Sequence, residues 1–291
     1  MRVSDNAKFA SISKNVQKAQ SDFVSAQQKA GSGLRVSKPS DDPVAAAQAR
    51  REASRKALGE AGVAAADTAT DQLMGADTAL GDVYEGLTRA HELALAGATD
   101  SMSKENRSDL AQEMRKIRDQ MVSLGNTKVG DKFVFAGYRD QTAPFEASGN
   151  FVGDGSIKEV QPVNGMRVQA SISGASVFGN GNSDDAFKTL DAVIAGLESN
   201  DAEAIRGQLS NLQTNQDRVA KSRSIVGSMI DSVELGRNVA DQQQARATTQ
   251  IASLTEADAV QSALNLMQAK SALEAAITVA SQIPQGLAQR G

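Results

Sequence analysis

The sequence contains no cysteine and no tryptophan, and it has a single histidine, His91, among its 291 residues. The absence of cysteine excludes disulfides, thiolate metal sites and a cysteine nucleophile. A lone histidine excludes a metal site with several histidine ligands and a histidine pair acting as acid and base. Aromatic residues make up only 3% of the chain, and proline occurs 5 times. These scarcities argue against a thick globular core and favour long helices packed along narrow seams.

The charge balance and the hydropathy pattern exclude further classes of protein. The 31 basic and 35 acidic residues leave a net charge of -4, which is too close to neutral for a general nucleic-acid binder. No run approaches the ~18 apolar residues that a membrane span requires. Residues 1–15 are polar and lack the apolar stretch of a secretory signal. We therefore expect a chain that binds neither nucleic acid nor membrane, and that either stays in the cytoplasm or leaves the cell by another route.

The clearest periodicity lies in the proline-free stretch 163–283. From Ile205 onward every seventh residue is apolar, which is typical of a coiled-coil seam within one long helix. A helix of 50 residues would be roughly 75 Å long. A change of register near Glu256–Asp258 predicts a joint. The apolar row consists of Ile205, Leu212, Val219, Val226, Val233, Ala240, Ala247 and Leu254.

Both ends of the chain carry thin apolar stripes with helical spacing, and Gly31-Ser32-Gly33 predicts the end of the first helix. We expect these two helices to pair, the amino end against the carboxyl end. The first stripe comprises Phe9, Ile12, Val16, Ala19, Phe23, Ala26 and Ala30, and the second comprises Leu266, Ala269, Leu273, Ala276, Ala280, Ile283 and Leu287. The residues expected to pack in this coiled coil and between subunits are Phe9, Ile12, Val16, Phe23, Ile251, Leu254, Leu266, Leu273, Ile277 and Ile283.

The middle of the chain combines helix signals with a stretch of different composition. Asp42 and Pro43 suit the cap and first residue of a second helix, and Ser103 can cap a third. The apolar stripes of these helices are Leu73, Ala76, Leu80, Val83, Leu87, Ala90 and Ala94, then Leu110, Met114, Ile117, Met121 and Leu124. Between residues 126 and 182, glycine is frequent and apolar residues alternate with polar ones. This alternation predicts strands at 132–135, 157–160 and 167–172, with a hairpin turn at Asn164-Gly165 and helix resuming near Asp184.

The predicted fold is therefore mainly α: a long antiparallel helical rod or coiled coil formed by the N- and C-terminal regions, with a small β-rich insertion. Its boundaries are terminal helices at 1–40 and 255–291, a helical rod at 41–130 and 183–254, and the insertion at 131–182. Because the chain goes out and returns, we expect both termini at one end and the insertion at the other.

The two terminal helices, called the arms here, have too little apolar surface to fold as an isolated pair. The stripe of the first 30 residues offers few large apolar side chains. The free energy gained by burying them against one partner helix is smaller than the free-energy cost of ordering the backbone. We expect arms that are disordered in the free subunit and fold when neighbouring copies add further faces. The amino arm, residues 1–38, carries seven basic and two acidic residues. A basic arm can bind nucleic acid or a membrane surface, but this excess is more typical of a solvated helix face that meets acidic neighbours.

The chain offers no set of residues for catalysis, a cofactor or a metal. Gly153-Asp154-Gly155 lacks the third glycine and the strand–helix context of a nucleotide site, which favours a turn. The stretch Asn180, Asn182, Asp184 and Asp185 lacks the closing glutamate of a calcium loop, which favours a loop and a helix cap. Serine has no His–Asp pair to activate it. We predict a structural protein and no enzyme.

Three segments, Gly33–Ala46, Arg89–Ala98 and Asn126–Gly137 with Thr142–Phe145, resemble the motifs of flagellin-like proteins in their order and spacing. The segment Leu254–Asp258 and the helix after it fit the same family, so the resemblance spans nearly the whole chain. The residues that carry it are Gly33, Arg35, Pro39, Ser40, Asp41, Asp42, Pro43, Arg89, Glu92, Asn126, Thr127, Gly130, Phe133, Phe135, Gly137, Pro144 and Phe145.

The resemblance implies a structural part of the bacterial flagellum that connects the hook to the filament. It implies paired terminal helices that form the inner tube of an axial assembly. The expected partners are copies of the same chain in a ring, the hook-side junction protein, flagellin and an export chaperone. It also implies export through the flagellar type III apparatus to the outside of the cell, without a cleaved signal peptide.

Two alternatives differ from this reading. The segment Ile283-Pro284-Gln285 is similar to flagellin itself, and residues 284–291 lack the hydrophobic finish typical of the junction protein, so a filament subunit is the main alternative. Pro39, Pro43 and the segment Phe133–Gly137 favour the junction protein. An enzyme or a nucleic-acid module would need turnover, or saturable binding to duplex DNA, for which the residues give no basis.

Limited proteolysis of the purified single subunit tests the expectation about the arms. Cleavage before residue 33 and after residue 258 should precede any cleavage in the central helices, because disordered segments reach a protease site first. Arms that resist as long as the centre would contradict the expectation.

Overall fold

The computed structural model describes residues 2–182 and 184–288 and confirms the predicted class, a mainly helical fold with small two-stranded sheets. The chain forms two compact units. The described residues up to Ala57 and from Gln243 onward make one unit, and Leu58–Gln242 make the other. The helices are α1 (Arg2–Ser32), α2 (Pro43–Gly97), α3 (Lys104–Gly125), α4 (Gly174–Phe178), α5 (Ala186–Ser199), α6 (Ala202–Thr255) and α7 (Ala259–Ala288). The strands are β1 (Lys128–Val129), β2 (Lys132–Phe133), β3 (Glu159–Val163) and β4 (Met166–Gln169).

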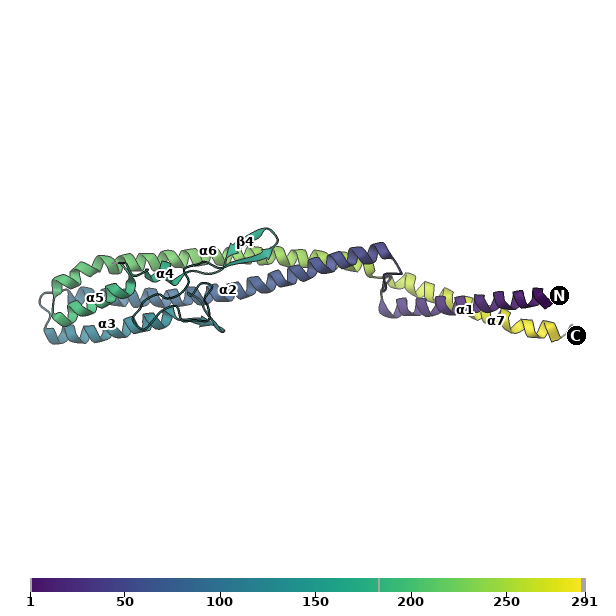
Figure 1. Ribbon diagram of the computed structural model, residues 1–291, viewed down its shortest axis with the longest axis horizontal. Coiled ribbons are helices and arrows are strands. Elements are labelled where there is room, and N and C mark those ends of the chain that lie inside the picture. The colour runs from purple at the N-terminus through teal and green to yellow at the C-terminus, as the bar shows by residue number, and fades with distance from the viewer. Residues whose placement is uncertain (1, 183, 289–291) are drawn as a thin grey trace. The chain divides into compact units, whose positions relative to one another are not determined.

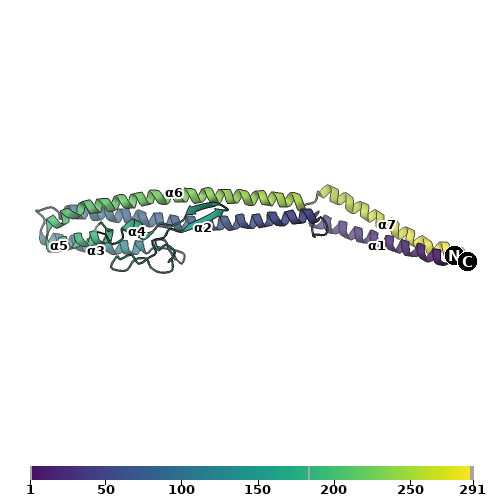
Figure 2. The same cartoon turned by 45° about the horizontal axis from the view of Figure 1, so that its top comes forward.

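The first unit contains the predicted pairing of the terminal helices. Helices α1 and α7 lie side by side, with the two ends of the chain at the same end of the pair (Figures 1 and 2). Helix α1 ends where the glycines predict, because Gly33 takes the left-handed backbone (φ 68°) and its N–H donates to the Lys29 carbonyl at 3.0 Å. The joint at 256–258 is also present, as the break between α6 and α7.

Helix starts follow the predicted caps. The Asp42 carboxylate accepts a hydrogen bond from the Ala45 N–H at 2.9 Å, and Pro43 is the first residue of α2. The Ser103 hydroxyl accepts the Asn106 N–H at 3.2 Å at the start of α3. Asp185 caps α5 by accepting the N–H groups of Phe187 and Lys188. The predicted loop and cap at 180–185 is thus confirmed for its described residues.

The heptad row of α6 is buried as predicted. All seven positions from Ile205 to Ala247 are at most 3% exposed, and Leu254 is half-buried. In the second unit these side chains share a core with the stripes of α2, α3 and α5. The fully enclosed members with large side chains include Leu73, Leu80, Leu87, Met114, Met121, Leu190, Leu197 and Leu212.

Several residues that stand four positions after the heptad row of α6 are polar and reach across to α2. Arg223 pairs with Asp77 (Nε–Oδ1 3.1 Å), and Arg237 pairs with Asp67 (Nε–Oδ1 2.5 Å). The Gln216 side chain, which is buried, donates to the Thr88 hydroxyl at 3.3 Å. As residue numbers fall along α6 they rise along α2, so the two helices run antiparallel. Each aspartate raises the pKa of the arginine it binds, mainly through the hydrogen bond between them.

The insertion differs from its prediction in where its strands begin and end. The hairpin β3–β4 is antiparallel with its turn at Asn164-Gly165, as predicted. The predicted strand 132–135 stops at Phe133, and its last residue bonds elsewhere, because the Phe135 carbonyl accepts the Gly174 N–H at 3.0 Å. The strand predicted at 157–160 lies two to three residues later, at Glu159–Val163, and the strand predicted at 167–172 shortens to Met166–Gln169. The short helix α4 follows.

The insertion is held to the helices by aromatic packing and by one close backbone approach. Phe145 contacts Phe151, Phe178 and Phe187 at ring-centroid distances of 4.9–5.4 Å, and Phe135 packs edge-on against Phe178. Pro162 of β3 lies against Gly62 of α2 and Gly236 of α6. A Cβ on Gly62 would come within 1.9 Å of the Pro162 carbonyl oxygen, so only glycine admits this contact.

Truncating the centre of this aromatic cluster should destabilise the second unit. Phe178→Ala leaves a cavity beside three other rings, and we expect a loss of ~3–5 kcal/mol in the free energy of unfolding by chemical denaturation. Tyr138→Ala is the control, because Tyr138 is 61% exposed and should change that free energy little. Equal losses in the two variants would contradict the assignment of the core.

Candidate functional site: the paired terminal helices and their clasp

The seam between α1 and α7 is half-buried along its length. Ile12, Val16 and Phe23 of α1, with Leu266 and Leu273 of α7, are all intermediate in exposure. Among the side chains of the two helices that the structure describes, none is fully buried. A seam formed by two helices leaves its edges open to water, so these residues have apolar surface that a further neighbour could cover.

The other predicted packing residues fall in different places. Ile251 and Leu254, near the end of α6, are half-buried, whereas Ile277 is 52% exposed and lies outside the seam. The side chains of Phe9 and Ile283 lie outside the described residues. A role between subunits for all of these positions stays a prediction.

A short clasp joins the segment after α1 to the end of α6. The Gly33 carbonyl accepts the Ala257 N–H at 2.9 Å, and the Thr255 carbonyl accepts the N–H groups of Arg35 and Val36 at 2.8 and 3.2 Å. The Arg35 guanidinium donates to the Leu254 carbonyl at 2.8 Å. These bonds satisfy the carbonyls that a helix leaves open at its C-terminus.

Two adjacent aspartates order the turn that follows the clasp. One Asp41 carboxylate oxygen accepts the Ser37 N–H, the Ser37 hydroxyl and the Lys38 N–H at 2.9–3.1 Å. These bonds, led by the Lys38 N–H, lower the pKa of Asp41. The pKa of Asp42 is lowered by the Ala45 N–H and then by Arg35, whose Nη1 lies 3.1 Å from Oδ2. Pro39 and Ser40 are exposed in the same turn, and Pro43 begins α2.

The remaining motif residues support the second unit. Arg89 binds Glu113 on α3 at 2.8 Å and Glu92 on its own helix at 3.1 Å. The Asn126 side chain donates to the Phe145 carbonyl at 2.9 Å and accepts the Phe145 N–H at 3.0 Å. The Asn126 bonds hold the end of α3 to the insertion, and the Arg89–Glu113 pair holds α2 to α3.

The glycines and aromatics of the same motif shape the insertion. Gly130 and Gly137 have positive φ angles, 59° and 63°. The Thr127 carbonyl accepts the Val134 N–H at 3.1 Å, and the Pro144 carbonyl accepts the Val152 N–H at 2.8 Å. Phe135 and Phe145 are buried, and Phe133 lies under the Lys128 ammonium at 4.4 Å. The structure thus groups most motif residues in two places, the clasp with the turn that follows it and the insertion, whereas Arg89 and Glu92 lie apart on α2.

Three features escaped sequence reasoning. Arg107 is buried and donates to the carbonyls of Gly97 and Thr99 and to the Asn200 side chain. Arg118 holds Asp191 and the carbonyls of Ala147 and Ser148. Neither arginine stands out in the sequence, because these partners lie beyond its own helix: Arg107 bonds to the end of α2, to the loop before α3 and to Asn200, and Arg118 bonds to the insertion and to α5.

The third feature is a ridge on α7, defined here as Val260, Leu264 and Met267, which are 71%, 48% and 67% exposed. Its i, i+4, i+7 spacing was visible in the sequence beside the seam row of the same helix. Large apolar side chains this exposed on one helix face mark an interaction surface.

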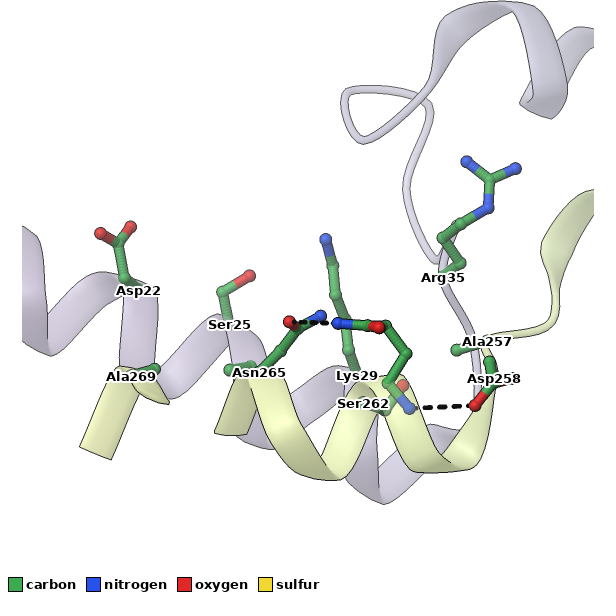
Figure 3. Close-up of a pocket in the computed structure, with 11 residues that line it drawn as sticks. Asp22, Ser25, Lys29, Arg35, Ala257, Asp258, Ser262, Asn265 and Ala269 are labelled. Atoms are coloured by element: carbon green, nitrogen blue, oxygen red, sulfur yellow. Dashed lines mark hydrogen bonds between the residues drawn. The ribbon is translucent and has the colours of Figure 1, made fainter. Parts of the chain in front are cut away.

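A groove lies along one side of the α1–α7 pair (Figure 3). Its volume is about 450 Å³, and Ala26, Ala257 and Ala269 contribute methyl groups to its lining. Ser25 and Asn265 line it from the two helices. A second hollow of about 450 Å³ shares Asp22, Asn265 and Ala269 with it, so the groove continues along the pair.

Other kinds of site find little support in the described residues. Within residues 2–182 and 184–288, no three His, Cys, Asp or Glu side chains gather closely enough to hold a metal ion. No helix in the same part of the chain has the length and apolarity needed to cross a membrane. His91 is half-buried on α2.

The turn offers a local test. Asp41→Ala removes the acceptor of the Ser37 and Lys38 N–H groups, so both should exchange with solvent several-fold faster by hydrogen-exchange NMR. Ser40→Ala, in the same turn, should leave both rates unchanged.

The same turn should depend on pH. Because the pKa of Asp41 is lowered, its ionised carboxylate stabilises the turn fully above pH 3.8, and this stabilisation is lost only as the pH falls below that value. A carboxyl titration midpoint above 3.8 would contradict this.

The sequence also has clear relatives. Residues 3–140 match the family described as the bacterial flagellin N-terminal helical region. The chain is 26% identical over 282 residues to flagellar hook-associated protein 3 of Escherichia coli (strain K12), covering 89% of each. It is 27% identical over 235 residues to flagellar hook-associated protein 3 of Salmonella typhimurium (strain LT2), covering 74% of each.

A solved structure extends the likeness to the fold. The flagellar junction protein FlgL from Legionella pneumophila superposes with a TM-score of 0.55 at 15% identity, covering 72% of this chain and 100% of that one. Fold, family match and the alignment over 89% of the chain agree with one another. The chain is therefore similar over most of its length to flagellar hook-associated protein 3 of two bacteria, and its residues 3–140 match the flagellin N-terminal helical region.

Proposed function

We propose that this chain is a structural component of the bacterial flagellum that joins the hook to the filament. The observation that carries the proposal is the pairing of α1 with α7 along a seam that remains half-buried, in a chain alignable with flagellar hook-associated protein 3 over 89% of its length. A seam of this kind is completed by additional helices. Copies of the same chain in a ring supply them.

The junction role is favoured over that of a filament subunit. Both curated relatives are named hook-associated protein 3, and neither is named flagellin. The segment Ile283-Pro284-Gln285, which resembles flagellin, lies where side chains are not described. The motif that contains Pro39 and Pro43 forms the defined turn that follows the clasp.

The partners and the location follow from the same role. The chain contacts the hook-side junction protein on one side and flagellin on the other, and an export chaperone holds it before assembly. It leaves the cell through the flagellar type III apparatus without a cleaved signal peptide and acts outside the cell. It has no catalytic role, which accords with relatives that are named as hook-associated proteins.

The arms complete their folding in the assembly. The half-buried seam of α1 and α7 supports this, because it gives the pair little enclosed apolar surface of its own. Binding to neighbouring copies then supplies the free energy that orders the arms.

Immunogold labelling of isolated flagella tests the location. An antibody against this chain should mark a single band where the hook meets the filament, and cells lacking the chain should carry hooks without attached filaments. Labelling along the whole filament would favour the filament subunit. A normal filament on the hook of the deletion strain would exclude the junction role.

A further inference from the structure

Helix α7 carries two apolar rows on different faces. The seam row, which includes Leu266 and Leu273, is half-buried beside α1. The ridge of Val260, Leu264 and Met267 is exposed, and Leu264 is two residues from Leu266, roughly 200° of helix rotation. The ridge therefore points away from α1 over a length of roughly 10 Å, seven residues at 1.5 Å each.

The groove along the pair has a complementary character. Small side chains in its lining, among them Ala26 and Ala269, leave room for the side chains of another helix. Its polar residues on α7 already bond to each other, since the Gln261 side chain donates to Asn265 at 3.0 Å and the Gln261 N–H donates to Asp258 at 2.9 Å (Figure 3). Four charged residues, Asp22, Lys29, Arg35 and Asp258, also line the groove (Figure 3). Between them, the alanine methyl groups are surface for an apolar partner.

The ridge and the groove can be occupied at the same time. On α7, Asn265 and Ala269 line the groove, and their places on the helix wheel lie more than a quarter turn from Leu264 and Met267. One copy can thus present its ridge to one neighbour while its groove receives another. Contacts between two different surfaces of the same chain repeat from copy to copy and generate rings or helical stacks.

We propose that the α7 ridge of one copy lies in the α1–α7 groove of the next copy. The proposal rests on the proposed function, because it names the contact by which copies pack in the ring. Two features single out a second copy as the occupant: the chain itself supplies both an exposed apolar ridge and a groove with small side chains in its lining, and the seam beside that groove is half-buried.

Engineered cysteines test the contact directly, because the natural sequence has none. One variant carries Leu264→Cys on the ridge, and another carries Ser25→Cys at the groove. Both positions are exposed, so neither change disturbs a core. Cells that produce both variants, each with its own tag, are treated with a short bismaleimide cross-linker, and the flagella are isolated. The expected main product is a dimer with one copy of each variant.

The control replaces the groove variant by Val24→Cys. Val24 precedes Ser25, is 43% exposed and does not line the groove, so it should give little cross-linking to Leu264→Cys. Strong cross-linking of Leu264→Cys to itself, to Val24→Cys or to a protein other than this chain overturns the proposal.

Immunogold labelling of the same flagella separates the two levels of inference. Variants that label the hook–filament boundary but give no Leu264→Cys to Ser25→Cys dimer overturn the ridge–groove contact and leave the junction role standing. Variants that assemble elsewhere overturn the junction role, whatever the cross-linking shows.

Discussion

Two paired helices cannot enclose both edges of the seam between them, and this constraint governs the first unit, which contains α1 and α7. Ile12, Phe23 and Leu273 keep part of their apolar surface in water, although each faces the partner helix. The second unit differs because α3, α5 and the insertion add to its two long helices, and its core side chains are fully enclosed. The chain thus combines a unit with an enclosed core and a unit whose seam stays half-exposed to water.

Most helix positions were predictable from the sequence because they depend on local chemistry. A cap such as Asp42 or Ser103 acts on N–H groups within three residues, so its effect can be inferred without the fold. The heptad row of α6 was predictable for a related reason, since a seam of one long helix repeats the same environment every two turns. The clasp was foreseen only as a motif, because its partners lie more than 200 residues away.

The insertion and the candidate surface were harder to predict, for different reasons. The alternation of residue types over 132–135 predicted a longer strand than forms. Alternation cannot reveal that the Phe135 carbonyl accepts the N–H of Gly174, which is distant in sequence. The contact of Pro162 with Gly62 joins two distant segments and leaves no periodic trace. The ridge on α7 did leave one, but a second apolar row on one helix can be distinguished from the seam row only once the partner helix is placed.

The hydrogen bonds of the clasp impose an order on the folding of the chain. It joins Arg35 to the Leu254 carbonyl across 219 residues, and Gly33 to Ala257. During synthesis from the amino end, α1 can form early, but the hydrogen bonds of the clasp cannot form until almost the whole chain has been made. A chain that stops before residue 254 therefore has neither these bonds nor the partner helix of α1, so its first helix stays unpaired.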